Sequence, residues 1–486
     1  MTQDRDVYDQ LDRSEDLGLL IGGSWRVRDE KIEVRNSFAN ELVGRISRGT
    51  PADVRDAVGA AVEALNEEWP AHRRYEVLTR AAALVDDNQE AYARDIAREG
   101  SKAIREARRE PPRVTMILRL AAEEARRSAG EVLPFDIRPG SERRVGYYVR
   151  VPVGVIAAIL PFNDPLAVMA HKVGPALAGG NAVVLKPDSS SPLAALRLAA
   201  HLQQAGLPAG RLNVVTGHGS EIGDALVEDE RVRMISFTGG VKTGERITRR
   251  AGIKKLTLEL GANSPVIVLA DAELDRAVPA VAAGAFAQAG QNCLGVQRII
   301  VQADVYDAFA RRLASTADGL TAGSSLDEAT DVCPLIHKRE AERVEEWINE
   351  AVAAGARVLT GGRREGALVW PTVMENVPDG ARLDSDEVYG PVVSLYRVAS
   401  LDEAIDKANN VPFGLHAAVF TENLHDAFEA VRRLNVGAVM VNDSTDYRLD
   451  TMPFGGTGKS GIGREGIRFA LEEMTETRVV CFNLKQ

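Results

Sequence analysis

The hydrophobic and polar positions follow two different patterns along the chain. In the first 130 residues, after a short lead-in at 19–25, apolar residues recur every third or fourth position opposite charged faces. This spacing predicts amphipathic helices at residues 53–69, 73–98 and 113–128. The arginine-rich stretch 102–127 is interpreted as a solvated helix face, with Pro111–Pro112 as the break between two helices.

From Val151 onward, short apolar runs alternate with helical stretches. This alternation is typical of βαβ units around a parallel sheet, so we expect an α/β fold. The first set has predicted strands at 153–160 and 182–186, helices at 165–178 and 192–204, and further strands in LNVV, RMISF and LTLEL. The second set has a strand at 265–269, a helix near 273–288, a strand at 298–301, a helix at 338–354 and short strands to about Met440.

Length and charge exclude several classes of protein. A chain of 486 residues suggests about three structural units. The 59 Lys and Arg against 70 Asp and Glu leave a net charge of −11, which argues against a nucleic-acid partner. The sequence has no run of about 18 apolar residues, and its acidic start MTQDRDVYDQLDRSEDLG lacks the apolar core of a signal peptide. We expect a soluble, cytoplasmic protein without a membrane partner.

The cysteines and histidines argue against a disulfide framework and a metal site. Three cysteines, Cys293, Cys333 and Cys481, cannot all pair within one chain. The sequence has no CxxC or HExxH spacing, and its seven histidines are scattered. We therefore expect no bound metal.

Two residues are candidates for catalysis. Cys293 lies in the glycine-rich segment AGQNCLGVQR, between a predicted helix and strand, where a partly exposed thiolate can act as a nucleophile. Glu259 interrupts the strand LTLEL, and burial would raise its pKa toward that of a general base. Taken singly, each has a structural alternative: an inert thiol and a salt-bridged strand end.

Ligand-binding signals follow the predicted strands. Asn163, in LPFNDPL, comes directly after a strand, where an amide can donate to a developing oxyanion; a plain turn is the alternative. The glycines of GHG (217–219) and FTGG (237–240) can cradle phosphate at a helix start, although GxGxxG is absent. Lys186 ends a strand and can reach a ribose or phosphate.

Together these residues resemble the aldehyde dehydrogenase superfamily over essentially the whole chain. The matching segments are, in order, LPFNDPL, GPALAGGNAVVLKP, FTGG, LELGANSP, GQNCLGVQR, EVYGPVV, NNVPFGL and MPFGGTGKSGIGREG. The resemblance implies a Rossmann-type coenzyme domain (1–130 and 150–259), an α/β catalytic domain (260–460) and a β oligomerisation arm (131–149 and 471–486). Because the arm strands need a partner edge, a homodimer or homotetramer is expected.

The resemblance also implies an NAD(P)-dependent aldehyde dehydrogenase mechanism. Cys293 attacks the aldehyde to give a thiohemiacetal, whose oxyanion is held by the Asn163 amide and the Cys293 backbone N–H. Hydride transfer to the coenzyme leaves a thioester, and Glu259 activates the water that hydrolyses it. A CoA-acylating dehydrogenase is one alternative, although such enzymes tend to lack the glutamate base. A non-catalytic binding protein on the same fold is the other.

The same resemblance implies two groups of binding residues. The coenzyme group is Leu160, Pro161, Phe162, Lys186, Ser189, Gly219, Phe237, Gly239, Gly240, Leu260, Gly261, Glu387 and Tyr389. Within it, Lys186 is expected at the adenosine ribose, Glu387 at the nicotinamide ribose, and Gly239–Gly240 at the pyrophosphate. Ser189 stands where NAD-preferring relatives often carry Glu, which favours NADP slightly; the adjacent Asp188 keeps NAD open.

The substrate group implied by the resemblance is Arg113, Asp164, Val168, Asn292, Leu294, Arg448 and Phe454. Relatives that act on phosphorylated or phosphonate aldehydes tend to have Arg where this chain has Asn292. Arg113 and Arg448 can still pair with a carboxylate, which suggests a small polar or carboxylated aldehyde such as a semialdehyde. The alternative is that both arginines form surface ion pairs.

Overall fold

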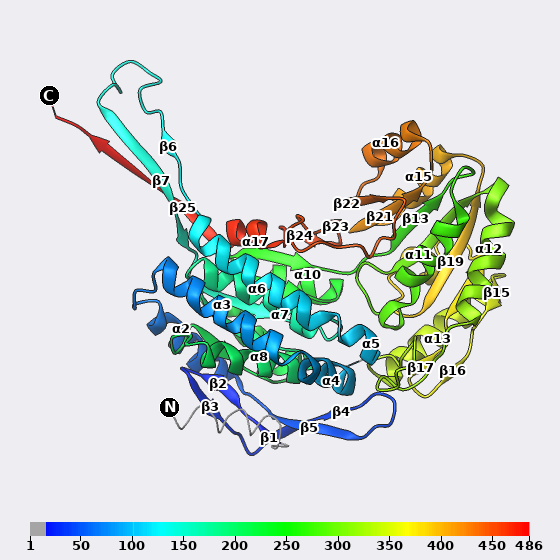
Figure 1. The fold of residues 1–486 in the computed structure, drawn as a ribbon, viewed down its shortest axis with the longest axis horizontal. Helices are drawn as coiled ribbons and strands as arrows, with labels where there is room; N and C mark the ends of the chain where they lie inside the picture. The colour runs from blue at the N-terminus through cyan, green and yellow to red at the C-terminus, as the bar shows by residue number, and fades with distance from the viewer. Residues whose placement is uncertain (1–15, 101, 486) are drawn as a thin grey trace.

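The computed structural model describes residues 16–100 and 102–485, and its N-terminal half is built around an eight-stranded sheet (Figure 1). The strand order is β24-β12-β11-β8-β9-β10-β2-β3, parallel from β12 to β10 and antiparallel outside them. The bounds are β2 (Leu19–Ile21), β3 (Ser24–Arg26), β8 (Val155–Ile159), β9 (Ala182–Lys186), β10 (Leu212–Val214), β11 (Val232–Thr238), β12 (Lys255–Glu259) and β24 (Gly461–Ile462).

Helices cover both faces of this sheet, which explains why its central strands are apolar throughout. Successive residues of β8 alternate between the two sides: Ile156 and Ala158 join one apolar cluster, Val155 and Ala157 the other. One face is covered by α2 (Pro51–Ala64), α9 (Gly219–Glu228) and α10 (Val241–Arg250). The other face is covered by α3 (Ala71–Asp87), α4 (Gln89–Glu99), α6 (Glu110–Arg127), α7 (Pro165–Ala178) and α8 (Leu193–Gln204).

A second, seven-stranded sheet has its own apolar core. Its order is β15-β18-β19-β14-β13-β21-β22, parallel except for β15. The strands are β13 (Ser264–Val268), β14 (Val296–Gln302), β15 (Arg357–Thr360), β18 (Thr372–Glu375), β19 (Val392–Val398), β21 (His416–Phe420) and β22 (Ala438–Val441). The helices are α11 (Leu274–Phe286), η1 (Ala287–Gly290), α12 (Ala303–Asp318), α13 (Lys338–Ala353), α14 (Arg382–Ser385), α15 (Leu401–Asn409) and α16 (Leu424–Arg433).

A three-stranded arm projects from the body of the molecule (Figure 1). The C-terminal strand β25 (Thr475–Asn483) pairs along its whole length with β7 (Arg144–Pro152), whose other edge meets β6 (Val132–Leu133). The helix α17 (Ile467–Glu473) leads into β25. A three-stranded sheet of order β1-β5-β4 and two strand pairs, β16-β17 and β20-β23, complete the fold. Their bounds are β1 (Asp16–Leu17), β4 (Lys31–Arg35), β5 (Leu42–Ser47), β16 (Arg364–Glu365), β17 (Leu368–Val369), β20 (Phe413–Gly414) and β23 (Thr457–Gly458).

The structure corrects three local predictions in the N-terminal region. The single helix expected at 73–98 is two, because Asn88 leaves helical geometry (φ −123°, ψ 24°) and its amide donates to the Leu84 carbonyl at 2.8 Å. The β4–β5 hairpin lies in a stretch where mostly helix was expected. Pro111–Pro112 lie in the first turn of α6, where missing N–H groups are tolerated, and the break precedes them, after α5 (Ile104–Ala107).

The arginine-rich stretch 102–127 is also less solvated than its composition indicates. Its cationic and acidic side chains include Lys102 and Glu110, which are buried. No helix in the described part of the chain is long and apolar enough to span a membrane. Residues 1–15 of the expected coenzyme domain and Gln486 of the expected arm lie outside the described residues.

Candidate active site

A cavity of about 800 Å³ lies where the C-terminal ends of β8, β9, β11 and β12 face the loop before β14. Parallel α/β sheets place their ligands at this edge. All residues of the catalytic, coenzyme and substrate groups named above line the cavity. These are Arg113, Leu160, Pro161, Phe162, Asn163, Asp164, Val168, Lys186, Ser189, Gly219, Phe237, Gly239, Gly240, Glu259, Leu260, Gly261, Glu387, Tyr389, Asn292, Cys293, Leu294, Arg448 and Phe454.

Part of the cavity wall, called the glycine wall below, is the backbone of Gly219, Gly239, Gly240 and Gly261. A Cβ on Gly239 would lie 2.5 Å from Phe237 Cζ, and one on Gly261 would lie 2.1 Å from Glu387 Oε2. Gly239 and Gly240 lead into α10, and Gly219 begins α9, so backbone N–H groups at two helix starts face the cavity. This arrangement fits the phosphates of a dinucleotide.

Glu387 is fixed beside this glycine wall. Its Oε1 accepts a hydrogen bond from the Ala262 N–H at 2.9 Å, and its burial raises its pKa to about 7. The methyl of Ala262 packs in an apolar cluster with Leu294 and Phe454. The Ala262 side chain is therefore part of the core of the site, while the Ala262 backbone N–H orients Glu387.

Three polar residues, Lys186, Asp188 and Ser189, line another part of the cavity. Ser189 lines the cavity beside Asp188, which accepts a hydrogen bond from the Ser190 N–H at 2.8 Å. Lys186 is buried, donates to the Pro187 carbonyl at 2.9 Å and has a pKa lowered by burial. A cation that lines the cavity with only a carbonyl acceptor suits a ribose hydroxyl or a phosphate.

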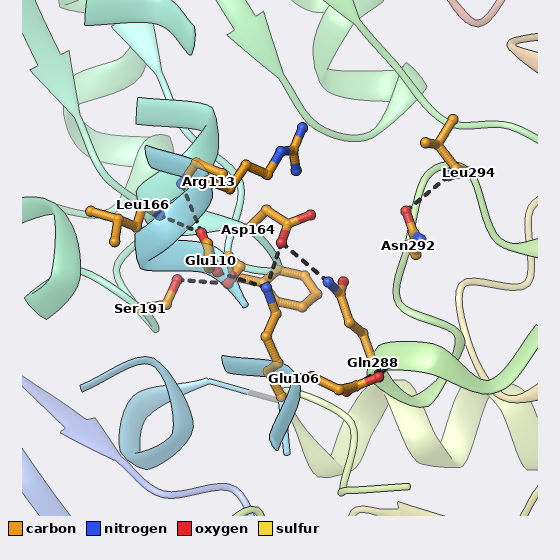
Figure 2. Close-up of polar contacts among 12 residues, drawn as sticks. Glu106, Glu110, Arg113, Asp164, Leu166, Ser191, Gln288, Asn292 and Leu294 are labelled. Atoms are coloured by element: carbon orange, nitrogen blue, oxygen red, sulfur yellow. Dashed lines mark hydrogen bonds and ion pairs between the residues drawn. The ribbon is translucent and has the colours of Figure 1, made fainter. Parts of the chain in front are cut away.

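The loop that carries Cys293 is held in an unusual conformation. Gln288 and Ala289 both have left-handed backbone (φ 52° and 55°), which non-glycine residues rarely adopt. The carboxylate of Glu106 accepts from the Gln288 N–H at 3.1 Å, and Asn292 Oδ1 accepts from the Leu294 N–H at 3.0 Å (Figure 2). Contacts from α5 and within the loop thus hold the residues on either side of the cysteine.

The Cys293 thiol is half-buried and protonated at neutral pH. Burial raises its pKa, and the nearby carboxyl groups of Glu259 and Asp164 raise it further. The charge of Arg448 lowers the pKa, but burial and the two carboxyl groups outweigh it. The thiol therefore needs a base before it can act as a nucleophile.

Glu259 ends β12 and lines the same cavity as Cys293. Its side chain is buried, and Oε2 has no hydrogen-bond partner among the described residues. Burial raises its pKa well above the usual range, and the charge of Glu465 adds to the shift. The salt-bridged alternative considered for this residue is not what the structure contains, since no ion pair to Glu259 exists in the described ranges. Asn163, after β8, is buried on the same cavity.

The two arginines of the substrate group are partly buried, and both form ion pairs at the cavity wall. Arg113 Nε donates to Asp450 Oδ1 at 2.8 Å, and His171 Nε2 lies 2.9 Å from the same oxygen. Arg448 pairs with Glu465 at 3.1 Å, and its guanidinium lies 3.7 Å from the centre of the Phe454 ring. Carboxylates therefore fix both guanidiniums in place at the cavity wall.

Other charged residues of the site carried no local sequence signal. Lys102 lies between Asp164 and Glu110, at 2.7 Å from Glu110 Oε2. Glu110 Oε1 in turn accepts from the backbone N–H groups of Leu166 and Ala167, at 2.9 and 2.7 Å, and so caps α7 (Figure 2). The contacts of Lys102 with Asp164 and of Glu110 with Leu166 and Ala167 join residues more than 50 positions apart, which is why no spacing rule reveals them. The described residues contain no group of three His, Cys, Asp or Glu placed to hold a metal ion.

Comparison with known proteins agrees with this geometry. The family model described as the aldehyde dehydrogenase family matches residues 25–480. The chain is 46% identical to the 3-sulfolactaldehyde dehydrogenase of Priestia aryabhattai over 98% of this chain and 99% of the relative. It is also 46% identical to the aspartate-semialdehyde dehydrogenase 1 of Pseudomonas canavaninivorans, covering 94% and 98% of the two chains.

A similar solved structure is the NADP-dependent glyceraldehyde-3-phosphate dehydrogenase of Bacillus halodurans, complexed with NADP. It matches with a TM-score of 0.94 and 36% identity, over 97% of this chain and all of that one. The match spans both sheets and the cavity between them. The chain therefore belongs to the aldehyde dehydrogenase family.

Proposed function

We propose that the protein oxidises a small aldehyde bearing a negative charge, such as a carboxylated semialdehyde, to the corresponding acid, with NADP slightly preferred over NAD. The observation that carries this proposal is that Cys293, Glu259 and Asn163 line one cavity with two fixed guanidiniums. The names of the relatives support it, because sulfolactaldehyde and aspartate semialdehyde are both short aldehydes that carry a negatively charged acid group.

The protein's own groups perform the following acyl chemistry. Glu259 accepts the thiol proton, and Cys293 Sγ attacks the aldehyde carbon to form a thiohemiacetal. The Asn163 amide and the Cys293 backbone N–H hold its oxyanion. A nicotinamide coenzyme bound in this cavity would supply the acceptor for the hydride of that carbon, which would leave a thioester on Cys293. Glu259 then releases the thiol proton to solvent and, ionised again, takes a proton from water, so that hydroxide adds to the thioester and displaces the Cys293 thiolate from the acid.

The glycine wall is proposed to bind the coenzyme. The N-termini of α9 and α10 would face the pyrophosphate, Lys186 the adenosine ribose and Glu387 the nicotinamide ribose. The absence of a carboxylate at Ser189 removes a charge that would repel a 2′-phosphate. Structural similarity to an NADP complex supports this choice.

Domains and assembly are proposed on the same basis. Residues 1–130 and 150–259 would form the coenzyme domain and 260–460 the catalytic domain, with 131–149 and 471–486 as the arm. The arm exposes Val132, Tyr147, Val479 and Phe482, which supports a homodimer or homotetramer. Three free cysteines suit a cytoplasmic enzyme.

One alternative deserves a direct test. A CoA-acylating enzyme would pass the thioester to a thiol, but the buried, unpaired Glu259 favours hydrolysis by water. Initial rates of coenzyme reduction should therefore be measured with NAD and NADP against neutral, carboxylated, sulfonated and phosphorylated aldehydes, with and without CoA. Cys293→Ala serves as the blank. Silence with every aldehyde from a folded, coenzyme-binding protein would overturn the proposed activity.

The charge preference has its own test. Arg448→Ala should raise the Michaelis constant for an anionic aldehyde by about 10- to 100-fold, because a charge-assisted contact is lost. The constant for a neutral aldehyde of equal length should change far less. Equal changes for both aldehydes would contradict a carboxylate-binding role for Arg448.

A further inference from the structure

We propose that Asp164 selects aldehydes that carry a hydrogen-bond donor, a hydroxyl or an ammonium group, on the carbon next to the carbonyl. The inference rests on the proposed aldehyde oxidation in this cavity. It adds a second recognition element, besides the two arginines, that the reaction itself does not require.

The first argument is the unequal use of the two Asp164 oxygens. Oδ1 accepts hydrogen bonds from both Lys102 and Gln288, the latter at 3.1 Å. Within the described chain, Oδ2 has no protein partner. Figure 2 shows this second oxygen turned away from the two donors. The side chain remains 22% exposed and lines the cavity, so Oδ2 is available to a ligand.

The second argument is that Asp164 is an acceptor only. Although burial opposes ionisation, the charges of Lys102 and Arg113 keep the pKa of Asp164 below its usual range. An ionised carboxylate has no proton to donate, so its free oxygen binds a donor and repels a second anion. The distal acid group of the substrate is therefore excluded from this side of the cavity.

The third argument concerns where on the substrate such a donor must lie. Asp164 directly follows Asn163, the proposed oxyanion donor, and consecutive Cα atoms lie about 3.8 Å apart. Both side chains line the cavity that Cys293 lines. A group held by Asp164 therefore belongs close to the carbonyl carbon. Arg113 and Arg448, anchored on Asp450 and Glu465, are left for a distant anion.

A purely structural role for Asp164 is the competing explanation. In that case the residue only joins Lys102 on the α5–α6 side to Gln288 on the nucleophile loop, and its loss would impair all aldehydes equally. The two explanations differ in the ratio of kcat/KM between a substituted and an unsubstituted aldehyde. Intrinsic aldehyde reactivities cancel when this ratio is compared between variants.

The experiment uses the full-length enzyme and aldehydes of matched length that carry no acid group, which keeps anion binding by the arginines out of the comparison. Wild type, Asp164→Ala and Asp164→Asn are assayed with propanal, 2-hydroxypropanal and 2-aminopropanal. We expect Asp164→Ala to lower the 2-hydroxypropanal to propanal ratio by about 10- to 100-fold, the loss typical of a hydrogen bond to a charged group. In Asp164→Asn the ratio of 2-aminopropanal to propanal should fall more than the ratio of 2-hydroxypropanal to propanal, because this variant removes the charge that attracts the ammonium group.

The matched control is Gln288→Leu, which removes an Oδ1 partner and leaves Oδ2 in place. Its ratio should stay within about 2-fold of wild type by the additivity expected without a shared substrate contact. A ratio that is unchanged in both Asp164 variants, or that rises, would overturn the inference. Inactivity of wild type toward every aldehyde would instead refute the proposed function. Thermal melting and coenzyme binding show whether the variants are folded, and Asp164→Asn keeps the native shape.

Discussion

The two walls of the cavity are built from different materials. The proposed coenzyme wall is mostly backbone: glycines at 219, 239, 240 and 261 that follow parallel strands of one sheet. The proposed substrate wall is mostly charge: Arg113, Asp164 and Arg448, each held by a charged partner on another segment of the chain. The proposed coenzyme site is therefore a shape set by local backbone geometry. The proposed aldehyde site is instead a set of charged side chains, which substitutions can change without changing the backbone.

The largest effect is expected at the junction of the two walls. Glu259→Gln removes the base and leaves both binding surfaces intact, so steady-state turnover should fall by about 100- to 10,000-fold. Because Glu259 is proposed to serve both thiol deprotonation and water activation, rapid-mixing measurement should show that coenzyme reduction is already slow in the first turnover, with coenzyme affinity unchanged. Loss of coenzyme binding in this variant would contradict the separation of the walls.

Breaking an ion pair should damage the substrate wall most. Glu465→Ala leaves Lys172 and Arg448, which lie 3.1 Å from its oxygens, buried without a carboxylate. Removing one partner of a buried pair costs about 3–5 kcal/mol of unfolding free energy. Urea unfolding measures this loss.

The matched control is an exposed pair of the same type. Glu472→Ala removes the partner of Arg468, also at 3.1 Å, on the surface of α17. The unfolding free energy should then change by only about 0–1 kcal/mol. Similar losses for Glu465→Ala and Glu472→Ala would show that the substrate wall does not depend on its internal pairs.

The coenzyme wall should instead fail through shape. In Gly261→Ala the new methyl meets Glu387 Oε2 at 2.1 Å, so the glutamate must move away from the Ala262 N–H. Coenzyme affinity should weaken by about 10- to 100-fold, as expected for overpacking of 1–3 kcal/mol. The control is Gly59→Ala on α2, whose methyl would lie 3.6 Å from Arg231 Nη1. Fluorescence titration with NADP separates the two variants.

The smallest effect is a pH dependence of coenzyme binding. Burial raises the pKa of Glu387 to about 7, so below pH 7 the group is increasingly protonated and accepts ribose hydroxyls less well. The dissociation constant of the coenzyme should therefore rise a few-fold as the pH falls from about 8 to about 6. Glu387→Gln should flatten this profile. A wild-type profile that is flat over the same range would remove Glu387 from the ribose site.

The two walls also differ in how far the chain pattern predicted them. The strands around Ile156, Val184 and Phe237 and the glycines after them followed from alternation and turn chemistry, because parallel strands bring their carboxyl ends together whatever lies between them. The family segments identified Cys293, Glu259 and Asn163. The helix break at Asn88 and the β4–β5 hairpin escaped because short-range periodicity does not resolve them.

The alternation of apolar and polar residues thus predicted the α/β class, and the family segments predicted the family and the residues that line the cavity. Folding decided what those residues are joined to. Arg113 meets Asp450 across 337 positions, and Lys102 meets Asp164 across 62, because ion pairs depend on distance in space and not on spacing in sequence. The same holds for the protonated Cys293 and the raised pKa of Glu259, since burial and neighbouring charges exist only in the folded chain.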